Sequence, residues 1–161
     1  MYQNRIVGYG EVDATELLAN PNNYRIHPKM QQELLNAVMS DVGIVQNVIV
    51  NVTTNHVVDG HLRVALAMRN NQKIPVTYVK LSDEEEKVIL ATYDPSTQYA
   101  VNDAELYKDL LKDIETSNDV LQKLFTQELV EMKIEDPMAE DVDDALSDSD
   151  KKYMLMVECS S

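Results

Sequence analysis

Apolar and polar positions in the first half of the chain follow two different periods. Short runs rich in β-branched residues predict strands at residues 5–10, 48–52, 56–58 and 74–79. Apolar residues that recur every three or four positions predict helices at 28–42 and 61–70. The turn at 53–55 joins two predicted strands, which we therefore expect to form a hairpin. Strands that alternate with helices favour an α/β (α+β) fold, with helices packed on a small mixed sheet.

Three further helices are predicted in the second half. Ser82 and Glu85 have the spacing of a capping box, so a helix is expected to begin after Ser82 and to end before Pro95. The acidic run Asp83–Glu86 suits the positive end of that helix dipole. The alternative is a metal cluster, although neighbouring helical positions point in different directions. Amphipathic spacing predicts the other two helices, at residues 103–115 and 119–132.

These elements predict a chain of four parts. They are a main domain at 1–95, a helical extension at 96–132, an acidic linker at 133–150 and a terminal strand segment at 151–161. The linker has too little apolar surface to order itself. The terminal segment carries a strand-like apolar pattern, and an uncovered strand of this kind is prone to aggregate. We expect it to pair with a sheet edge of its own chain or of a second copy in a homodimer, or to be the stump of a further domain.

Composition limits the cellular setting and the partners. The chain has one cysteine, Cys159, so a disulfide framework within it is excluded, and no apolar run approaches the roughly 20 residues of a membrane span. A cytoplasmic protein with no membrane partner is therefore expected. Residues 1–80 carry seven Lys or Arg against six Asp or Glu, whereas residues 81–161 carry seven against 22. Duplex binding needs clustered basic residues, so any DNA partner is expected at the first half or on another chain.

The segment Gly60-His61-Leu62-Arg63 is the main candidate for chemistry. A predicted strand runs directly into Gly60, and a helix-forming run follows at once. The first N–H groups of such a helix have no partner within it, and together with the helix dipole they favour an anion. Arg63 lies on the first turn, where its guanidinium suits phosphate oxygens. The segment predicts a phosphate cradle; the alternative is an ordinary strand-to-helix corner with two exposed polar residues.

A set of short segments, taken in their order along residues 5–132, carries a family resemblance. They are Val12, Leu17-Leu18, Asn20–Asn23, Arg25–Pro28, Gly43–Gln46, Val48–Val50, Val58–Arg63, Ala67 and Pro75-Val76. Taken together, the set resembles the ParB/sulfiredoxin superfamily, in particular the ParB-like N-terminal domains of phage and mobile-element proteins. The Gly60–Arg63 turn corresponds to Gly-Glu-Arg-Arg in ParB partition proteins and to Gly-Cys-His-Arg in sulfiredoxin, whose cysteine is catalytic. The chain has no cysteine there, which excludes a sulfinic-acid reductase.

The resemblance implies a nucleotide pocket at this turn, for CTP in partition proteins and for ATP or ADP in relatives. It implies that Gly60, His61, Leu62 and Arg63 hold phosphates. Gln46 matches the glutamine of the Gly-x-x-Gln segment near the nucleotide, although locally it is also consistent with a polar residue at a strand edge. Arg25 either approaches the phosphates or pins its Asn-rich loop to a carboxylate.

The sequence departs from the ParB pattern at the residues linked to hydrolysis. His61 and Leu62 replace the acidic residue and the adjacent arginine, while Arg63 keeps the position of the second arginine. We therefore expect Asp59 and His61 to be the catalytic candidates. Asp94 occupies a place comparable to the family's metal motif and is the candidate ligand for Mg²⁺ bound with a nucleotide. No basic recognition helix follows, so reading of DNA by a helix-turn-helix is not expected.

Three functions stay open at this point. The first is a ParB-like nucleotide-binding domain in phage or mobile-element DNA transactions, acting as a switch or as a CTPase-like phosphohydrolase. The second is a Mg²⁺-dependent DNA nuclease or an accessory of a DNA methyltransferase, and the third is a non-catalytic interaction scaffold. The resemblance places the protein in the cytoplasm of a bacterial host or a phage-infected cell.

Overall fold

The computed structural model describes residues 1–97, 100 and 103–134, with side chains for 1–93, 100 and 103–132. Two compact units divide the chain, Met1–Phe125 and Thr126–Ser161. The predicted terminal strand and nearly all of the predicted acidic linker lie outside the described residues. The expected four-part organisation stays a prediction.

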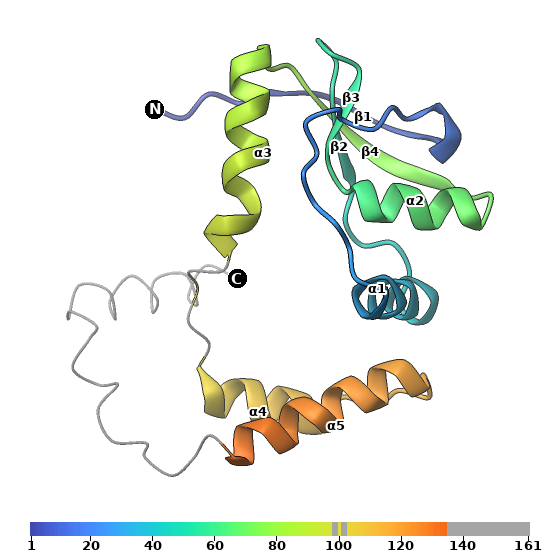
Figure 1. Cartoon of the computed structure of the whole chain (residues 1–161), viewed down its shortest axis with the longest axis vertical. Helices are drawn as coiled ribbons and strands as arrows, with labels where there is room; N and C mark the ends of the chain where they lie inside the picture. The colour runs from blue at the N-terminus through green and yellow to red at the C-terminus, as the bar shows by residue number, and fades with distance from the viewer. Residues whose placement is uncertain (98–99, 101–102, 135–161) are drawn as a thin grey trace. The chain divides into compact units, whose positions relative to one another are not determined.

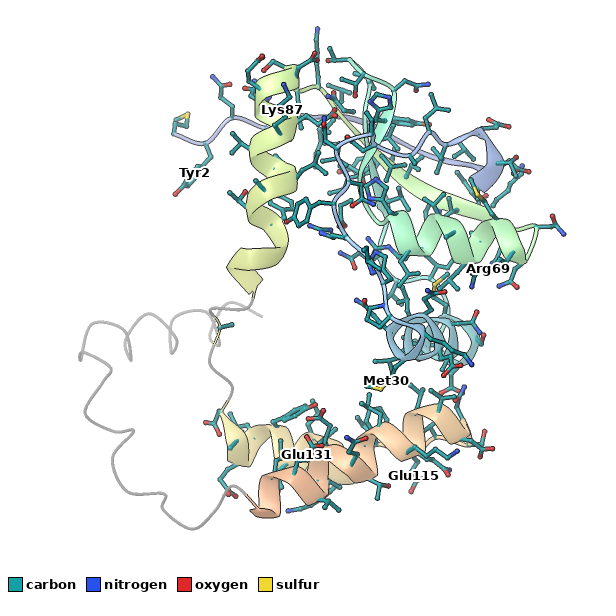
Figure 2. The ribbon with its side chains drawn as sticks, in the orientation of Figure 1. Tyr2, Met30, Arg69, Lys87, Glu115 and Glu131 are labelled. Carbon is teal, nitrogen blue, oxygen red and sulfur yellow. The ribbon has the colours of Figure 1, made fainter. Side chains whose placement is uncertain are left out.

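Strands and helices are interspersed in the first part of the chain, and three helices follow the last strand (Figure 1). In chain order they are β1 (Ile6–Asp13), a short 3-10 helix η1 (Ala14–Glu16), α1 (Lys29–Asp41), β2 (Val48–Asn51), β3 (His56–Asp59), α2 (His61–Arg69), β4 (Lys73–Val79), α3 (Asp83–Thr97), α4 (Ala104–Asp113) and α5 (Asp119–Ile134). Figure 2 shows Arg69 at the C-terminal end of α2 and Lys87 on α3. Among the described residues, no helix has both the length and the apolarity needed to cross a membrane.

The four strands form one mixed sheet in the order β1-β4-β2-β3. β2 and β3 are antiparallel neighbours, which confirms the predicted hairpin, and β1 pairs antiparallel with β4. β2 and β4 run parallel, with Val48 opposite Val76. The mixed sheet with its packed helices confirms the predicted α+β class. Because β3 is antiparallel to β2 and β4 is parallel to it, β3 ends at the edge of the sheet where β4 begins, and α2 lies in the connection between them.

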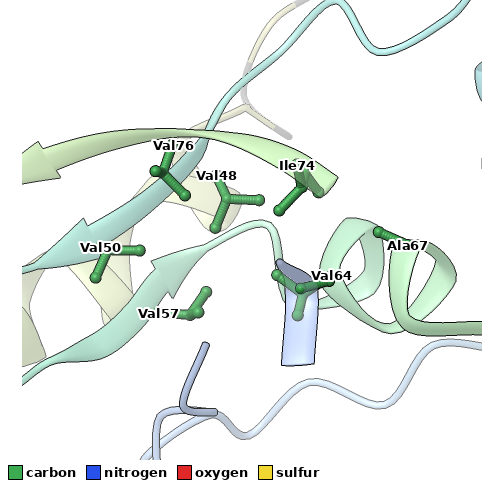
Figure 3. Packing of buried hydrophobic residues seen from close by; sticks show 8 residues of the cluster. Val48, Val50, Val57, Val64, Ala67, Ile74 and Val76 are labelled. Atoms are coloured by element: carbon green, nitrogen blue, oxygen red, sulfur yellow. The ribbon is translucent and has the colours of Figure 1, made fainter. Parts of the chain in front are cut away.

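The main core lies between one face of this sheet and α2 (Figure 3). Its buried members are Ala14, Val48, Val50, Val57, Val64, Ala67, Ile74 and Val76. Fully burying one such valine or isoleucine stabilises a fold by about 1.5–3 kcal/mol. Val58, which follows Val57 and points to the other face of β3, is also buried. Both faces of β3 are thus covered, and β3 leads directly into the turn before α2.

Two predicted boundaries are corrected by the structure. The strand predicted at 5–10 continues as β1 to Asp13, where the sequence also indicated a strand end, and it pairs with β4 as far as Lys73. Pro28 is the N-cap of α1 rather than its first helical residue. α3 runs through Pro95 to Thr97, so the prediction that Pro95 ends this helix is wrong. Proline removes one backbone donor and bends a helix, but the flanking hydrogen bonds can carry the helix beyond it.

Candidate functional site

Gly60 shapes the turn between β3 and α2. Its φ of +95° lies in the left-handed region, which residues with a side chain rarely adopt. A Cβ at this position would lie 3.0 Å from both Arg63 Nη2 and Val48 Cγ2. Glycine is therefore needed for the backbone direction and also for the close approach of the Arg63 side chain.

The N-terminus of α2 is open. Gly60 is its N-cap, and among the described residues no side chain caps the helix. The Gly60 carbonyl accepts the first intrahelical bond from the Val64 N–H, at 3.0 Å. The N–H groups of His61, Leu62 and Arg63 therefore have no acceptor within the helix. The structure confirms the predicted helix beginning beside Gly60. Free N–H groups and the positive end of a helix dipole are features that favour an anion.

Arg63 is held beside this terminus by three acceptors. Its Nη1 donates to Gln46 Oε1 at 2.9 Å, and its Nη2 donates to Asp59 Oδ2 at 2.9 Å and to the Asn47 carbonyl at 3.4 Å. The side chain is only 14% exposed. A guanidinium fixed by several bonds loses little conformational freedom when it meets a ligand. Arg63 is thus preorganised on the same turn of α2 that carries the free N–H groups.

Asp59 joins a second arginine to the same cluster. Arg25 Nη1 lies 3.7 Å from Asp59 Oδ1, and both side chains are largely buried, at 15% and 21% exposure. Arg25 therefore pins its Asn-rich loop to a carboxylate, as one of the two interpretations of the sequence expected. Two guanidinium groups share one carboxylate, so the Arg25–Asp59–Arg63 group carries a net positive charge.

His61 is in its neutral form at neutral pH. Burial lowers the pKa of its imidazole, the positive charge of Arg25 lowers it further, and Asp59 opposes the change only in part. Nε2 accepts the backbone N–H of Asn20 at 3.3 Å, so the ring proton lies on Nδ1.

Two buried donors in this cluster have no partner in the part of the chain that the structure describes. Among the described residues, His61 Nδ1 and Arg63 Nε are the buried side-chain nitrogen or oxygen atoms that make no hydrogen bond. An unpaired buried polar group costs about 1–3 kcal/mol, so such groups require an explanation. Both atoms belong to residues of the first turn of α2, where a bound anion would supply the missing acceptor.

The structure brings most of the predicted site residues into one cluster. Arg63 connects Gln46 to Asp59, and Asp59 connects Arg63 to Arg25. The Leu62 side chain is buried, with 9% exposed, so only its backbone faces the candidate site. Asp94 lies within α3, but its side chain is outside the described residues, and its role as a metal ligand stays a prediction. In the described part of the chain, no group of three or more His, Cys, Asp or Glu side chains is arranged to hold a metal ion.

Two residues that support the site were not identified from the sequence. Asn20 donates its backbone N–H to His61, and Glu86 binds the Asn20 side chain from α3. We assigned Glu86 to an acidic run that suits the helix dipole, but it is 4% exposed. Glu86 lies one turn before the buried Leu90, so the helical period already placed it on the inward face.

Comparison with known proteins identifies the fold. No protein-family profile and no curated protein matches the chain. Among solved structures, the chain is similar to a C-terminally truncated chromosome-partitioning protein ParB from Caulobacter crescentus, complexed with CTP-γ-S. The TM-score is 0.58 at 19% identity, and the match covers 96% of this chain and 88% of that one. A Pnob8-like ParB-N domain matches with a TM-score of 0.44 and 10% identity, covering 97% of this chain and 53% of that one, so the chain spans about half of its length.

The likeness to the Caulobacter protein shows that this chain has a ParB-like fold. The fold predicted from the ordered sequence segments is therefore confirmed. At this level of identity the likeness concerns the fold, and the chemistry has to be argued from the cluster around Gly60.

Proposed function

We propose that the turn Gly60–Arg63 binds the phosphate groups of a nucleotide of the CTP or ATP class. The main support is the pair of buried, unpartnered donors, His61 Nδ1 and Arg63 Nε, at the open N-terminus of α2. Further support comes from the ParB of the same fold, which was solved with a CTP analogue. Among anions, a chain of phosphates offers enough acceptors to satisfy backbone N–H groups and two arginines together.

Each residue of the cluster has a defined part in this proposal. The N–H groups of His61, Leu62 and Arg63 bind phosphate oxygens at the helix terminus, and the Arg63 guanidinium adds charge-assisted bonds. Neutral His61 donates from Nδ1. Arg25 brings a second positive charge, which its contact with Asp59 keeps within the cluster.

Mg²⁺ is expected to enter with the nucleotide, because magnesium usually keeps several waters and binds through phosphates and one or two carboxylates. Asp59 fits this ion poorly in the present arrangement, since both of its oxygens face arginines. The Asp59 contacts favour binding of an anion over metal-dependent cleavage of DNA at this carboxylate.

The wider role that we propose is a nucleotide-dependent step in phage or mobile-element DNA transactions. The basic residues of the first half include Arg25 and Arg63, which belong to the cradle. Any contact with DNA would therefore use the remaining basic residues of the first half or a partner chain.

Isothermal titration calorimetry of the purified chain with CTP, ATP and ADP in the presence of Mg²⁺ tests the proposal. Arg63→Ala should weaken binding by about 1.5–3 kcal/mol, the contribution of hydrogen bonds to a charged group. Arg69→Ala is the matched control, because Arg69 lies at the other end of α2 and donates to Gln32 at 3.2 Å. This control should leave the affinity unchanged.

Two results would contradict the proposal. One is that none of the three nucleotides binds, and the other is that both arginine variants lose affinity equally. Cleavage of plasmid DNA by the pure protein with Mg²⁺, abolished by Asp59→Asn, would instead support the nuclease alternative.

A further inference from the structure

Glu86 is a buried carboxylate that three separate segments bind. Oε1 accepts from Asn20 Nδ2, and Oε2 accepts from Asn51 Nδ2 and from Thr54 Oγ1, each at 2.6 Å. These donors come from the loop before α1, from the end of β2 and from the β2–β3 turn. Glu86 is 4% exposed. Burial by itself raises the pKa of Glu86, but the three hydrogen bonds outweigh it and hold the pKa below its ordinary value, so the group is charged at neutral pH.

A continuous path of hydrogen bonds leads from Glu86 to His61. Glu86 holds the side chain of Asn20, which is itself only 4% exposed. The backbone N–H of the same asparagine donates to His61 Nε2 at 3.3 Å. This bond determines which ring nitrogen of His61 carries the proton and is able to donate to a ligand.

The same asparagine organises the loop that carries Arg25. Asn20 Oδ1 accepts the Asn22 N–H at 2.9 Å, and the Asn20 carbonyl accepts the Asn23 N–H at 3.0 Å. Asn23 Oδ1 in turn accepts the backbone N–H of Arg25 at 3.3 Å. The position of Asn20 therefore bears on both His61 and Arg25, two cradle residues from different parts of the sequence.

We propose that Glu86 is a positioning residue of the phosphate cradle: through Asn20 it orients the His61 imidazole and the loop of Arg25 without touching the ligand. The inference rests on the proposed function in so far as the cradle binds phosphate. It also makes α3, which carries Glu86, a support of the binding site. Asn51 and Thr54 also donate to the Glu86 carboxylate and so stabilise the fold, but they are not part of the hydrogen-bond path to His61.

The first test uses the ligand-free protein. Long-range ¹H–¹⁵N NMR spectra report the protonation of the two His61 ring nitrogens, and a thermal melt records stability alongside. In the wild type we expect a single tautomer with the proton on Nδ1. Glu86→Gln removes the charge and places an amide donor against other donors, so the His61 signals should shift toward a mixture of tautomers.

Two variants separate positioning from stability. Asn20→Ala and Thr54→Val each remove one hydrogen bond to Glu86, but only Asn20 lies on the path to His61. Asn20→Ala should shift the His61 signals, and Thr54→Val should lower the melting temperature while leaving those signals in place. This pair also tests the proposal if Glu86→Gln does not fold.

Calorimetry with CTP, ATP and ADP completes the test. Glu86→Gln should weaken nucleotide binding by about five-fold at a temperature where it is fully folded, comparable to losing one net hydrogen bond. Unchanged His61 signals in both Glu86→Gln and Asn20→Ala, or equal shifts in Thr54→Val, would overturn the proposal and leave Glu86 a stabilising clamp. If the wild type binds no nucleotide, the proposed function fails, whereas the ligand-free spectra still decide the part that Glu86 plays.

Discussion

Neutralising Asp59 should strengthen nucleotide binding rather than weaken it. Asp59 accepts a bond from Arg63 at 2.9 Å and lies 3.7 Å from Arg25, so it already supplies an anion to both arginines. A phosphate that binds at the same cluster must compete with this carboxylate and is repelled by its charge. Asp59→Asn keeps the shape of the side chain and an oxygen that can accept from Arg63, but it removes the charge.

The size of the effect follows from the charges and their exposure. Two unit charges about 8 Å apart interact by about 2 kcal/mol at an effective dielectric constant near 20. The Asp59 side chain is 21% exposed, so solvent and salt screen part of that repulsion. A gain of about 1 kcal/mol remains, which corresponds to roughly five-fold tighter binding.

Calorimetric titration with the nucleotide that binds best, at low and at high salt, measures this gain. The gain should be larger at low salt, because screening shortens the range of the repulsion. Glu33→Gln is the matched control, since it changes the net charge equally at an exposed position, where Glu33 pairs with Lys29. Weaker binding by Asp59→Asn, or equal gains in both variants, would refute the reasoning. If Asp59 is also catalytic, as predicted, hydrolysis should fall while affinity rises.

Two further predictions concern the turn and its histidine. Gly60→Ala and Gly43→Ala both place a side chain at positive φ, at +95° and +106°, but only the Cβ at position 60 would press on Arg63. In urea denaturation both variants should lose about 1–3 kcal/mol of stability. In calorimetry only Gly60→Ala should lose nucleotide binding. Equal binding by both variants would contradict this account of the turn. Because the pKa of His61 is lowered in the folded state, the unfolded chain binds more protons as the pH falls below about 6.5, and stability declines until the lowered pKa is passed. The free energy of unfolding, measured by urea denaturation at pH 5–7.5, should decline less in His61→Gln than in the wild type as the pH falls. The same pH dependence in both proteins would show that burial of His61 does not affect stability.

The sequence alone predicted the elements around the candidate site. The hairpin at 48–58 and the helix that begins beside Gly60 follow from local periodicity and from one glycine at a strand end. Such patterns reflect contacts between residues two to four positions apart, which the chain makes wherever it folds. The ordered segments that resemble ParB added Gln46 and Arg25 to the candidates, and the structure places both on the Asp59–Arg63 pair.

Only the tertiary structure decided which distant residues are bonded to the candidate site. Glu86 and Asn20 lie 66 positions apart in the sequence, and Asn20 and His61 lie 41 apart. Contacts over such distances depend on sheet order, strand register and the docking of α3, none of which a local pattern specifies. The helical period places Glu86 on the inward face of α3, but it does not say which donors meet the carboxylate. The fold resolves this for Glu86, because burying its carboxylate is tolerable only where three donors converge on it.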